Sequence, residues 1–310
     1  MQDSVDLENN LPEAKELLTE ENLKLELSHS GLREIAWIFN DKEIFTEENI
    51  QALQLHPKPM VLSETIILLH KIGILNQQNL KIVLSHSELE IVNLMLNTLQ
   101  EVGIFNQESF EKALSHQKLK PLKLSLYYLQ EAGMLTQENF EHVLSEQEIT
   151  PIALSLRYFQ EAGMLTQENF EHVLRHREPV CIVFSLRYFQ ETGILTQENF
   201  ESIRLHETPI CIERTLSFLD KAGILTQENF EGVVSHTKLE TVHRIQKLVQ
   251  EAGLLTQQNF ESIRLCPEPS HIELSLSSLY KAGILTQENF EQALLCQDKN
   301  ICTILKFIQE

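Results

Sequence analysis

Residues 133–141 read Gly-Met-Leu-Thr-Gln-Glu-Asn-Phe-Glu, and close copies of this phrase recur every 30 residues. The threonine of the phrase marks the period, at Thr136, Thr166, Thr196, Thr226, Thr256 and Thr286. The same phase continues upstream through Asn106, Asn76 and Thr46, and Thr19 precedes them after one shorter step. A fixed short period that covers almost the whole chain is typical of a protein built from stacked repeats.

Each copy of the phrase predicts a helical hairpin. Gly133 suits the position just after a helix, where the backbone turns left-handed. Thr136 is a good N-cap, so a first helix, called helix A, is expected over 137–145. A short variable connection follows, and Pro151 suits the first turn of a second helix. We expect this helix B over 151–162.

One hairpin of 30 residues buries too little apolar surface to offset the entropy lost on ordering it, so the hairpins must stack. The sequence therefore predicts an all-α protein. Its expected architecture is a single α-solenoid, a right-handed superhelix of about ten helix-turn-helix repeats over residues 14–310. A polar segment, 1–13, precedes it. In the expected final helix B, 301–310, Leu305 and Ile308 have no following repeat to cover them. We expect that the chain continues or that this end binds something.

Composition narrows the classes of partner. The chain has 25 Lys and Arg against 45 Asp and Glu, a net charge of −20, which disfavours nucleic acid and anionic membranes as ligands. A basic protein remains an allowed partner. Residues 1–13 lack the pattern of a signal peptide, and no apolar stretch is long enough to span a membrane. The five cysteines are interpreted as reduced core residues, which favours a cytoplasmic, reducing location.

The repeat also resembles a known group. The phrase Gly-Ile-Leu-Thr-Gln-Glu-Asn-Phe-Glu at 193–201, together with Val-Leu-Ser-His as at 83–86, resembles the tandem TPR-like helical repeats of Legionella-type and Coxiella-type intracellular bacteria. Several such proteins are translocated effectors. The resemblance covers residues 17–310. It implies an interaction scaffold that binds, and regulates or inhibits, a host protein or another effector, with delivery into a host cell cytosol. No family active-site motif exists to carry over.

A histidine recurs at the end of the expected helix A. It is His29, His56, His86, His116, His176, His206 and His236, with Glu146, Cys266 and Cys296 in the same phase. We expect these side chains to bond the last carbonyls of helix A and to complement its dipole. Successive members are one repeat apart, whereas a structural zinc needs four converging ligands. His172 and His176 have metal-compatible spacing, but the residues between them, Val-Leu-Arg, include no Glu base, which favours coincidence. No metal, cofactor or catalytic residue is predicted.

Three other columns repeat in nearly every copy. An Asn follows the N-cap by three residues, as Asn139 does after Thr136, and is expected to bond a neighbouring repeat's loop. The Phe that follows it is expected in the core. An acidic row, Glu138, Glu168, Glu198, Glu228 and Glu288, is interpreted as capping and solvation. Its alternative role is an acidic edge for a basic partner.

The candidate binding residues differ from one repeat to the next, whereas the Thr, Asn and Phe positions described above recur with little change. They form a second stripe on the expected helices B: Tyr127, Tyr128, Leu154, Arg157, Tyr158, Phe184, Arg187, Tyr188, Arg214, Phe218 and Arg244. Tyr and Arg are enriched among residues that dominate binding energy. The alternative is that this helix B stripe packs against flanking helices of the solenoid.

The sequence favours a non-catalytic scaffold for protein binding. An enzyme is the first alternative, but the chain has no phosphate-binding Gly-rich loop, nucleophile elbow or His-Glu-x-x-His motif. A helical-repeat reader of nucleic acid is the second. Tyr128, Tyr158 and Tyr188 with Arg157 and Arg187 partly match such a reader, but the net charge has the wrong sign.

Overall fold

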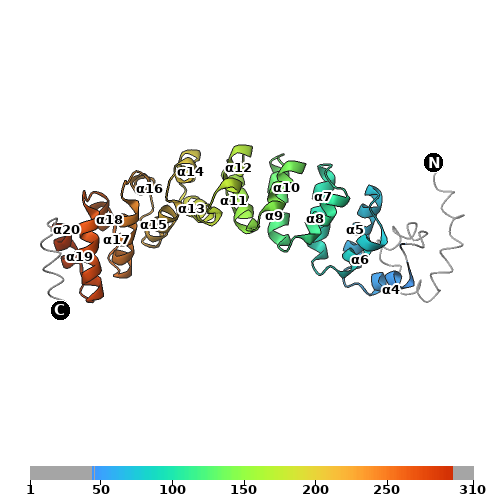
Figure 1. The fold of residues 1–310 in the computed structure, drawn as a ribbon, viewed down its shortest axis with the longest axis horizontal. Helices are drawn as coiled ribbons and strands as arrows, with labels where there is room; N and C mark the ends of the chain where they lie inside the picture. The colour runs from blue at the N-terminus through green and yellow to red at the C-terminus, as the bar shows by residue number, and fades with distance from the viewer. Residues whose placement is uncertain (1–43, 45, 296–310) are drawn as a thin grey trace, which may run out of the picture. The chain divides into compact units, whose positions relative to one another are not determined.

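The computed structural model describes residue 44 and residues 46–295, and every regular element in these residues is an α-helix (Figure 1). Helices A are α4 (Glu47–Leu55), α6 (Gln77–Ser85), α8 (Gln107–Ser115), α10 (Gln137–Ser145), α12 (Gln167–Arg175), α14 (Gln197–Arg204), α16 (Gln227–Val234), α18 (Gln257–Arg264) and α20 (Gln287–Leu295). Helices B are α5 (Pro59–Ile72), α7 (Leu89–Glu101), α9 (Leu119–Glu131), α11 (Ile149–Glu161), α13 (Pro179–Thr192), α15 (Pro209–Lys221), α17 (Leu239–Glu251) and α19 (Pro269–Lys281).

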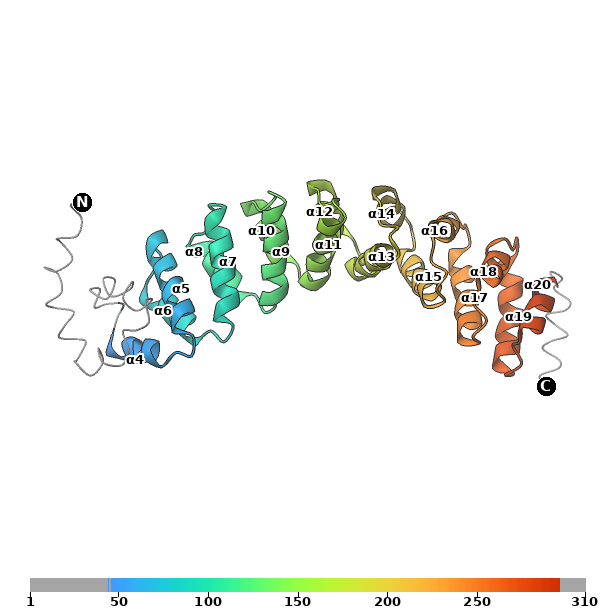
Figure 2. The same ribbon diagram turned by 180° about the vertical axis from the view of Figure 1, so that it is seen from behind.

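The α-solenoid prediction is confirmed, because within each part of the described chain the hairpins pack against their neighbours in chain order. The chain forms two compact units, and the division falls inside α11, between Ala153 and Leu154. Within each unit, consecutive hairpins lie side by side (Figures 1 and 2). The expected segment 1–13, the first repeat with His29, and the final helix 301–310 lie outside the described residues.

The predicted helix ends are confirmed. Gly193, with φ of 73°, follows α13, and its N–H donates to the carbonyl of Gln190 at 3.3 Å. The next N–H, of Ile194, donates to the carbonyl of Phe189 at 2.9 Å, which satisfies carbonyls that the helix leaves open. Thr196 then caps α14, because its hydroxyl accepts the backbone N–H of Asn199 at 3.1 Å.

Helix B begins earlier than expected in one repeat. The prediction placed its start at Pro151, but α11 begins at Ile149 and ends at Glu161. Pro179 and Pro209 do occupy the first position of α13 and α15. The N–H groups of a first turn have no acceptor inside the helix, so proline fits at any of these positions. A proline therefore locates the first turn but not its first residue.

Within each unit, the core lies between the two helices of each hairpin and between successive hairpins. The phenylalanines expected in the core are buried at Phe110, Phe140, Phe170, Phe200, Phe230, Phe260 and Phe290. Phe189 of α13 meets Phe230 of α16 edge to face, with ring centroids 4.7 Å apart. Successive helices B, such as α13 and α15, lie in close contact. Small buried side chains at Ser185 and Thr215 allow this approach.

Candidate functional site

The histidine column has a different role from the predicted one. The Nδ1 atom of His176 accepts the backbone N–H of Glu178, the N-cap residue of α13, at 3.0 Å. The same bond, at 3.0–3.1 Å, joins His56 to Lys58, His86 to Glu88, His116 to Lys118, His206 to Thr208, and His236 to Lys238. The predicted bond to the end of the preceding helix A is therefore wrong for these rings, although His236 also bonds the backbone of Arg264, the last residue of the following helix A, α18. Each ring turns forward across the short connection and supports the start of helix B.

This geometry requires a ring without a proton on Nδ1, since that atom accepts a hydrogen bond. Burial lowers the pKa of His86, His176, His206 and His236. A neighbouring carboxylate, such as that of Glu178 beside His176, opposes the shift less strongly at the first three. The neutral form that the bond requires is thus the form that burial favours.

The asparagine column joins successive repeats through their side chains. Asn199 donates from Nδ2 to the carbonyl of Ile194 in its own repeat at 2.7 Å and to Oε1 of Gln227 at 2.6 Å. Gln227 is the first residue of the next helix A, and its amide donates back to Oδ1 of Asn199 at 3.0 Å. The same reciprocal pair joins Asn79 to Gln107, Asn169 to Gln197, Asn229 to Gln257, and Asn259 to Gln287. The neighbouring partner is thus a helix residue and not the expected loop.

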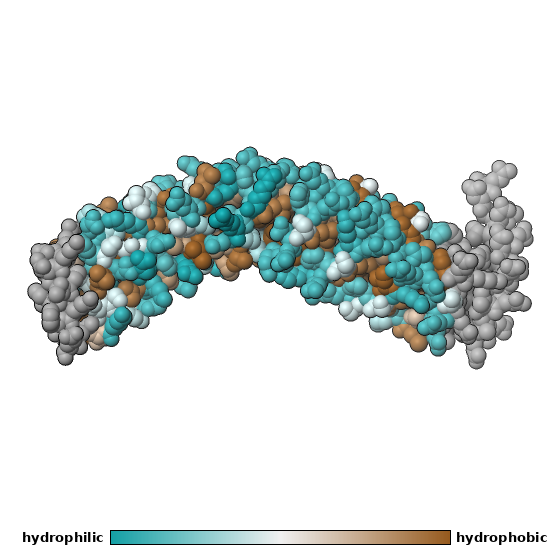
Figure 3. All heavy atoms as spheres, in the orientation of Figure 1, coloured by the Kyte–Doolittle hydropathy of each residue, from teal (hydrophilic) through white to brown (hydrophobic). Residues whose placement is uncertain are grey.

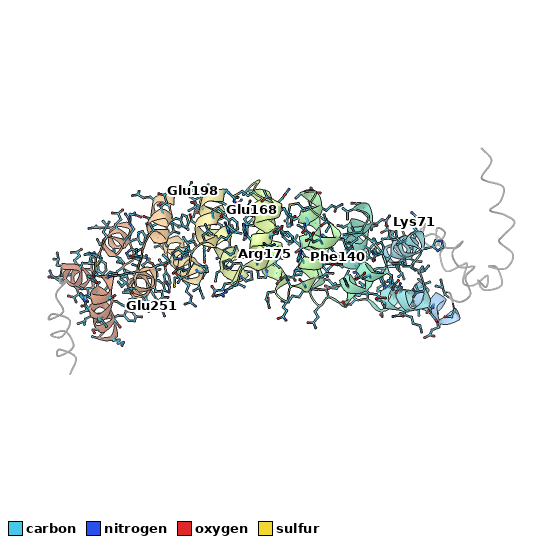
Figure 4. All side chains as sticks on the ribbon, turned by 45° about the horizontal axis from the view of Figure 1, so that its top comes forward. Lys71, Phe140, Glu168, Arg175, Glu198 and Glu251 are labelled. Atoms are coloured by element: carbon cyan, nitrogen blue, oxygen red, sulfur yellow. The ribbon has the colours of Figure 1, made fainter. Side chains whose placement is uncertain are left out.

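The acidic row lies exposed on helices A, and Figure 4 shows Glu168 and Glu198 on the same side of unit 2. Among the described residues, one group has metal-ligand types close together: atoms of Glu168, His172 and Glu201 lie within 4.8 Å of one another. The Glu201 carboxylate already accepts bonds from Arg204 Nε at 2.9 Å and from Gln197 Nε2 at 2.9 Å. His172 faces Glu168, at 3.4 Å, while His176 bonds the backbone.

The first part of the helix B stripe belongs to unit 1. Tyr127 of α9 is exposed and Tyr128 half-buried, and their rings meet edge to face at 5.3 Å. Unit 2 carries the rest of the stripe on α11, α13, α15 and α17. There Leu154 is half-buried, and Arg157 is exposed beside Tyr158, with its guanidinium carbon 5.8 Å from the ring centroid.

Arg187 of α13 is held between two rings of its own helix. Its guanidinium carbon lies 5.0 Å from the ring centroid of Phe184 and 4.8 Å from that of Tyr188. Phe184 is 37% exposed, whereas Tyr188 is only 6% exposed. Tyr188, one of the residues predicted to contact a partner, is covered by its neighbours. Its role is to support Arg187 from below.

On the next two helices B, α15 and α17, some residues of the stripe make contacts inside the protein and others do not. Phe218 of α15 stacks on the ring of His243, with centroids 5.4 Å apart and ring planes at 10°. Burial, reinforced by Arg214, Lys247 and Arg244, lowers the pKa of His243 to about 4. Arg244 binds Glu273 with nitrogen–oxygen distances of 2.6 and 3.1 Å. The exposed Arg214 forms no ion pair with any described carboxylate.

No model of a known protein family matches the chain, and a comparison with curated proteins gave no match either. The resemblance to bacterial tandem repeats stays a prediction. None of the described helices combines the length and the apolarity needed to cross a membrane. Cys181, Cys211 and Cys266, the cysteines within the described residues, are not joined in disulfides.

Proposed function

We propose that the protein is a non-catalytic scaffold that binds another protein through the helix B stripe of unit 2. The observation that carries this proposal is the contrast between two sets of side chains. One set already makes hydrogen bonds or packing contacts inside the solenoid: it comprises the capping threonines, the Asn–Gln pairs and the buried phenylalanines. Phe184 and Arg214 are instead large side chains left exposed on a helical surface. Aromatic and Arg side chains in such positions are typical of binding hot spots.

A solenoid surface suits this role for an energetic reason. The stripe residues stand on helices whose backbone is already ordered, so a partner meets a surface that loses little further entropy on binding. The face of the protein drawn in Figure 3 is largely hydrophilic with scattered apolar residues. Following the resemblance stated above, the proposed partner is a host protein or another bacterial effector whose activity the scaffold regulates.

The test is affinity purification with the full chain from host and bacterial lysates, followed by reconstitution of each candidate with purified protein. The stripe variant carries Arg157→Ala, Phe184→Ala, Arg187→Ala and Arg214→Ala. The control variant carries Arg175→Ala, at the end of α12, and Leu205→Ala, directly after α14, and both side chains are exposed. A partner that binds the wild type and the control but not the stripe variant supports the proposal.

Two other results would contradict it. Equal binding of the purified partner to both variants would remove the stripe from the interface. Loss of binding only with Glu168→Gln, Glu198→Gln and Glu228→Gln would place the partner on the acidic row of helices A. Circular dichroism of each variant must match the wild type, so that lost binding is not lost folding.

A further inference from the structure

Several basic side chains of unit 2 are paired with carboxylates of the protein. On helices A, Arg175 binds Glu171 at 2.9 Å, and Arg204 binds Glu201. On helices B, Arg157 binds Glu161 at 2.8 Å, and Arg244 binds Glu273. Arg187 and Arg214, on the adjacent helices α13 and α15, differ from these. Arg187 reaches its nearest carboxylate, on Glu191, only at 3.9 Å, and Arg214 forms no ion pair with a described residue.

One acid, Glu213, interacts electrostatically with both arginines but forms no ion pair with either of them. Glu213 lies beside Arg214 on α15, and both Arg214 and Arg187 act on its carboxyl through space. Burial nevertheless raises the pKa of Glu213, because it outweighs the attraction of the two arginines. The charges of Arg187 and Arg214 are therefore only partly compensated by the protein itself.

Arg187 is also oriented for recognition. The rings of Phe184 and Tyr188 hold its guanidinium, and its Nε is buried without a hydrogen-bond partner among the described residues. The planar guanidinium of an arginine can donate two parallel hydrogen bonds, like the prongs of a fork, to the two oxygens of a carboxylate. A guanidinium that is held in place by aromatic rings loses less conformational freedom on binding than a mobile one. The planar group is thus preorganised for a bidentate acceptor.

The neighbouring surface is apolar. Val180 and Phe184, one turn apart on α13, are both exposed and lie on the same side of the helix as Arg187. A ligand that bonds Arg187 and Arg214 through carboxylates would therefore place an apolar side chain against Val180 and Phe184. The exposed carboxylates of the acidic row and the net charge of −20 oppose a polyanion such as RNA, which needs an extended basic track.

We propose that the surface formed by Val180, Phe184, Arg187 and Arg214, called the α13–α15 patch, binds a protein segment that carries an Asp or Glu next to an apolar or aromatic residue. This inference rests on the proposed scaffold function and names the chemistry of the partner. The carboxylate accepts from the guanidinium groups, and the apolar side chain covers Phe184.

The test is selection of binders from a random 12-residue peptide library against the immobilised full chain. The enriched peptides are then synthesised and measured by fluorescence anisotropy. The patch predicts enrichment of acidic residues adjacent to Phe, Tyr, Trp or Leu. Arg187→Gln and Arg214→Gln should each weaken binding about 10- to 100-fold, as expected for a lost charged hydrogen bond. Arg187→Lys should also weaken it, since Lys keeps the charge without the fork. Arg175→Gln, on the helix A side, should have no effect.

The outcomes separate the two proposals. Enriched peptides without acidic residues, or acidic peptides whose binding survives Arg187→Gln and Arg214→Gln, would overturn the α13–α15 patch and leave the scaffold function standing. Peptides lost with Phe184→Ala but not with either arginine variant would likewise overturn carboxylate recognition. Enrichment of basic peptides would indicate that peptides bind at the acidic row of helices A and not at the α13–α15 patch. A library that yields no binder would contradict the patch and count against the scaffold as well.

Discussion

Asn199 and Gln227, 28 residues apart, exchange two side-chain hydrogen bonds of 2.6 and 3.0 Å, and Asn199 is buried where it makes them. Gln227 also donates to Glu231 at 2.8 Å, so each pair is tied to the surface of the next helix A. The pair fixes one hairpin against the next with directional bonds. Apolar contacts alone would specify that register less strictly.

Asn199→Ala should therefore lower the free energy of unfolding. The change removes bonds to Gln227 and to the Ile194 carbonyl, both half-buried, so the expected loss is ~1–2 kcal/mol. Urea unfolding followed by circular dichroism measures it. Glu198→Gln, an exposed isosteric change one residue away, is the control and should shift the midpoint little. Equal effects of the two changes would show that the amide pair adds nothing to stability.

The histidine bonds predict a loss of stability in acid. Because the folded-state pKa values of His86, His176, His206 and His236 lie below the ordinary 6.5, their contribution is complete above pH 6.5 and falls as the pH drops below it. A variant with Asn at all four positions keeps an acceptor for the N–H two residues on, without a titrating ring. Urea unfolding at pH 7.5, 6.5 and 5.5 should show a steeper decline for the wild type. Parallel declines would show that these rings titrate alike in both states.

Gln246 of α17 is an irregularity in the core. Leu156, Leu186, Leu216 and Leu276 occupy the same position in other repeats. Gln246 is fully buried, and neither end of its amide has a hydrogen-bond partner in the described part of the chain. Gln246→Leu should raise the free energy of unfolding by ~1–3 kcal/mol, because the cost of an unsatisfied buried amide disappears. Gln250→Leu, at a half-buried site, is the control. A lower midpoint for Gln246→Leu would indicate that the adjacent Ile245 leaves no room for leucine.

Burial should make one thiol slow to react. It raises the pKa of Cys181 to about 11 from an ordinary 9.0, with Glu178 and Glu213 adding to the shift. The thiolate fraction at pH 8, and with it the rate of alkylation, should be about 100-fold lower than for an exposed cysteine. Iodoacetamide labelling with mass spectrometry measures the rate, and the urea-unfolded chain provides the reference. Equal rates in the folded and unfolded chain would contradict the described burial.

The helical frame could be predicted from the sequence because each of its signals is local. A threonine cap, a left-handed glycine and an apolar residue every three or four positions act within one turn of the chain, and helix A over 137–145 agrees with α10. The role of the histidines could not be predicted in this way. A ring after helix A can turn back to its carbonyls or forward to helix B, and the residue pattern is the same for both.

The exposure of the candidate site residues could not be predicted from local sequence patterns either. Tyr158 and Tyr188 occupy equivalent positions, yet Tyr158 is half-buried and Tyr188 is buried. Their exposure depends on neighbouring side chains on adjacent helices, which differ from repeat to repeat. The change from Leu to Gln at position 246 was a visible break in a core column. Its burial, however, depends on packing that no local signal reports.

The central claim is that a partner binds helices B of unit 2, and side-chain footprinting with hydroxyl radicals tests it most directly. Oxidation is measured by mass spectrometry for the free chain and for the chain saturated with a reconstituted partner. Phe184, Val180 and Tyr158 on helices B are compared with Leu205 and Leu265, which are exposed near the ends of helices A. The account predicts that the partner lowers oxidation of Phe184 and Val180 and leaves Leu205 and Leu265 unchanged. Protection of the two leucines with unchanged oxidation of Phe184 would contradict it.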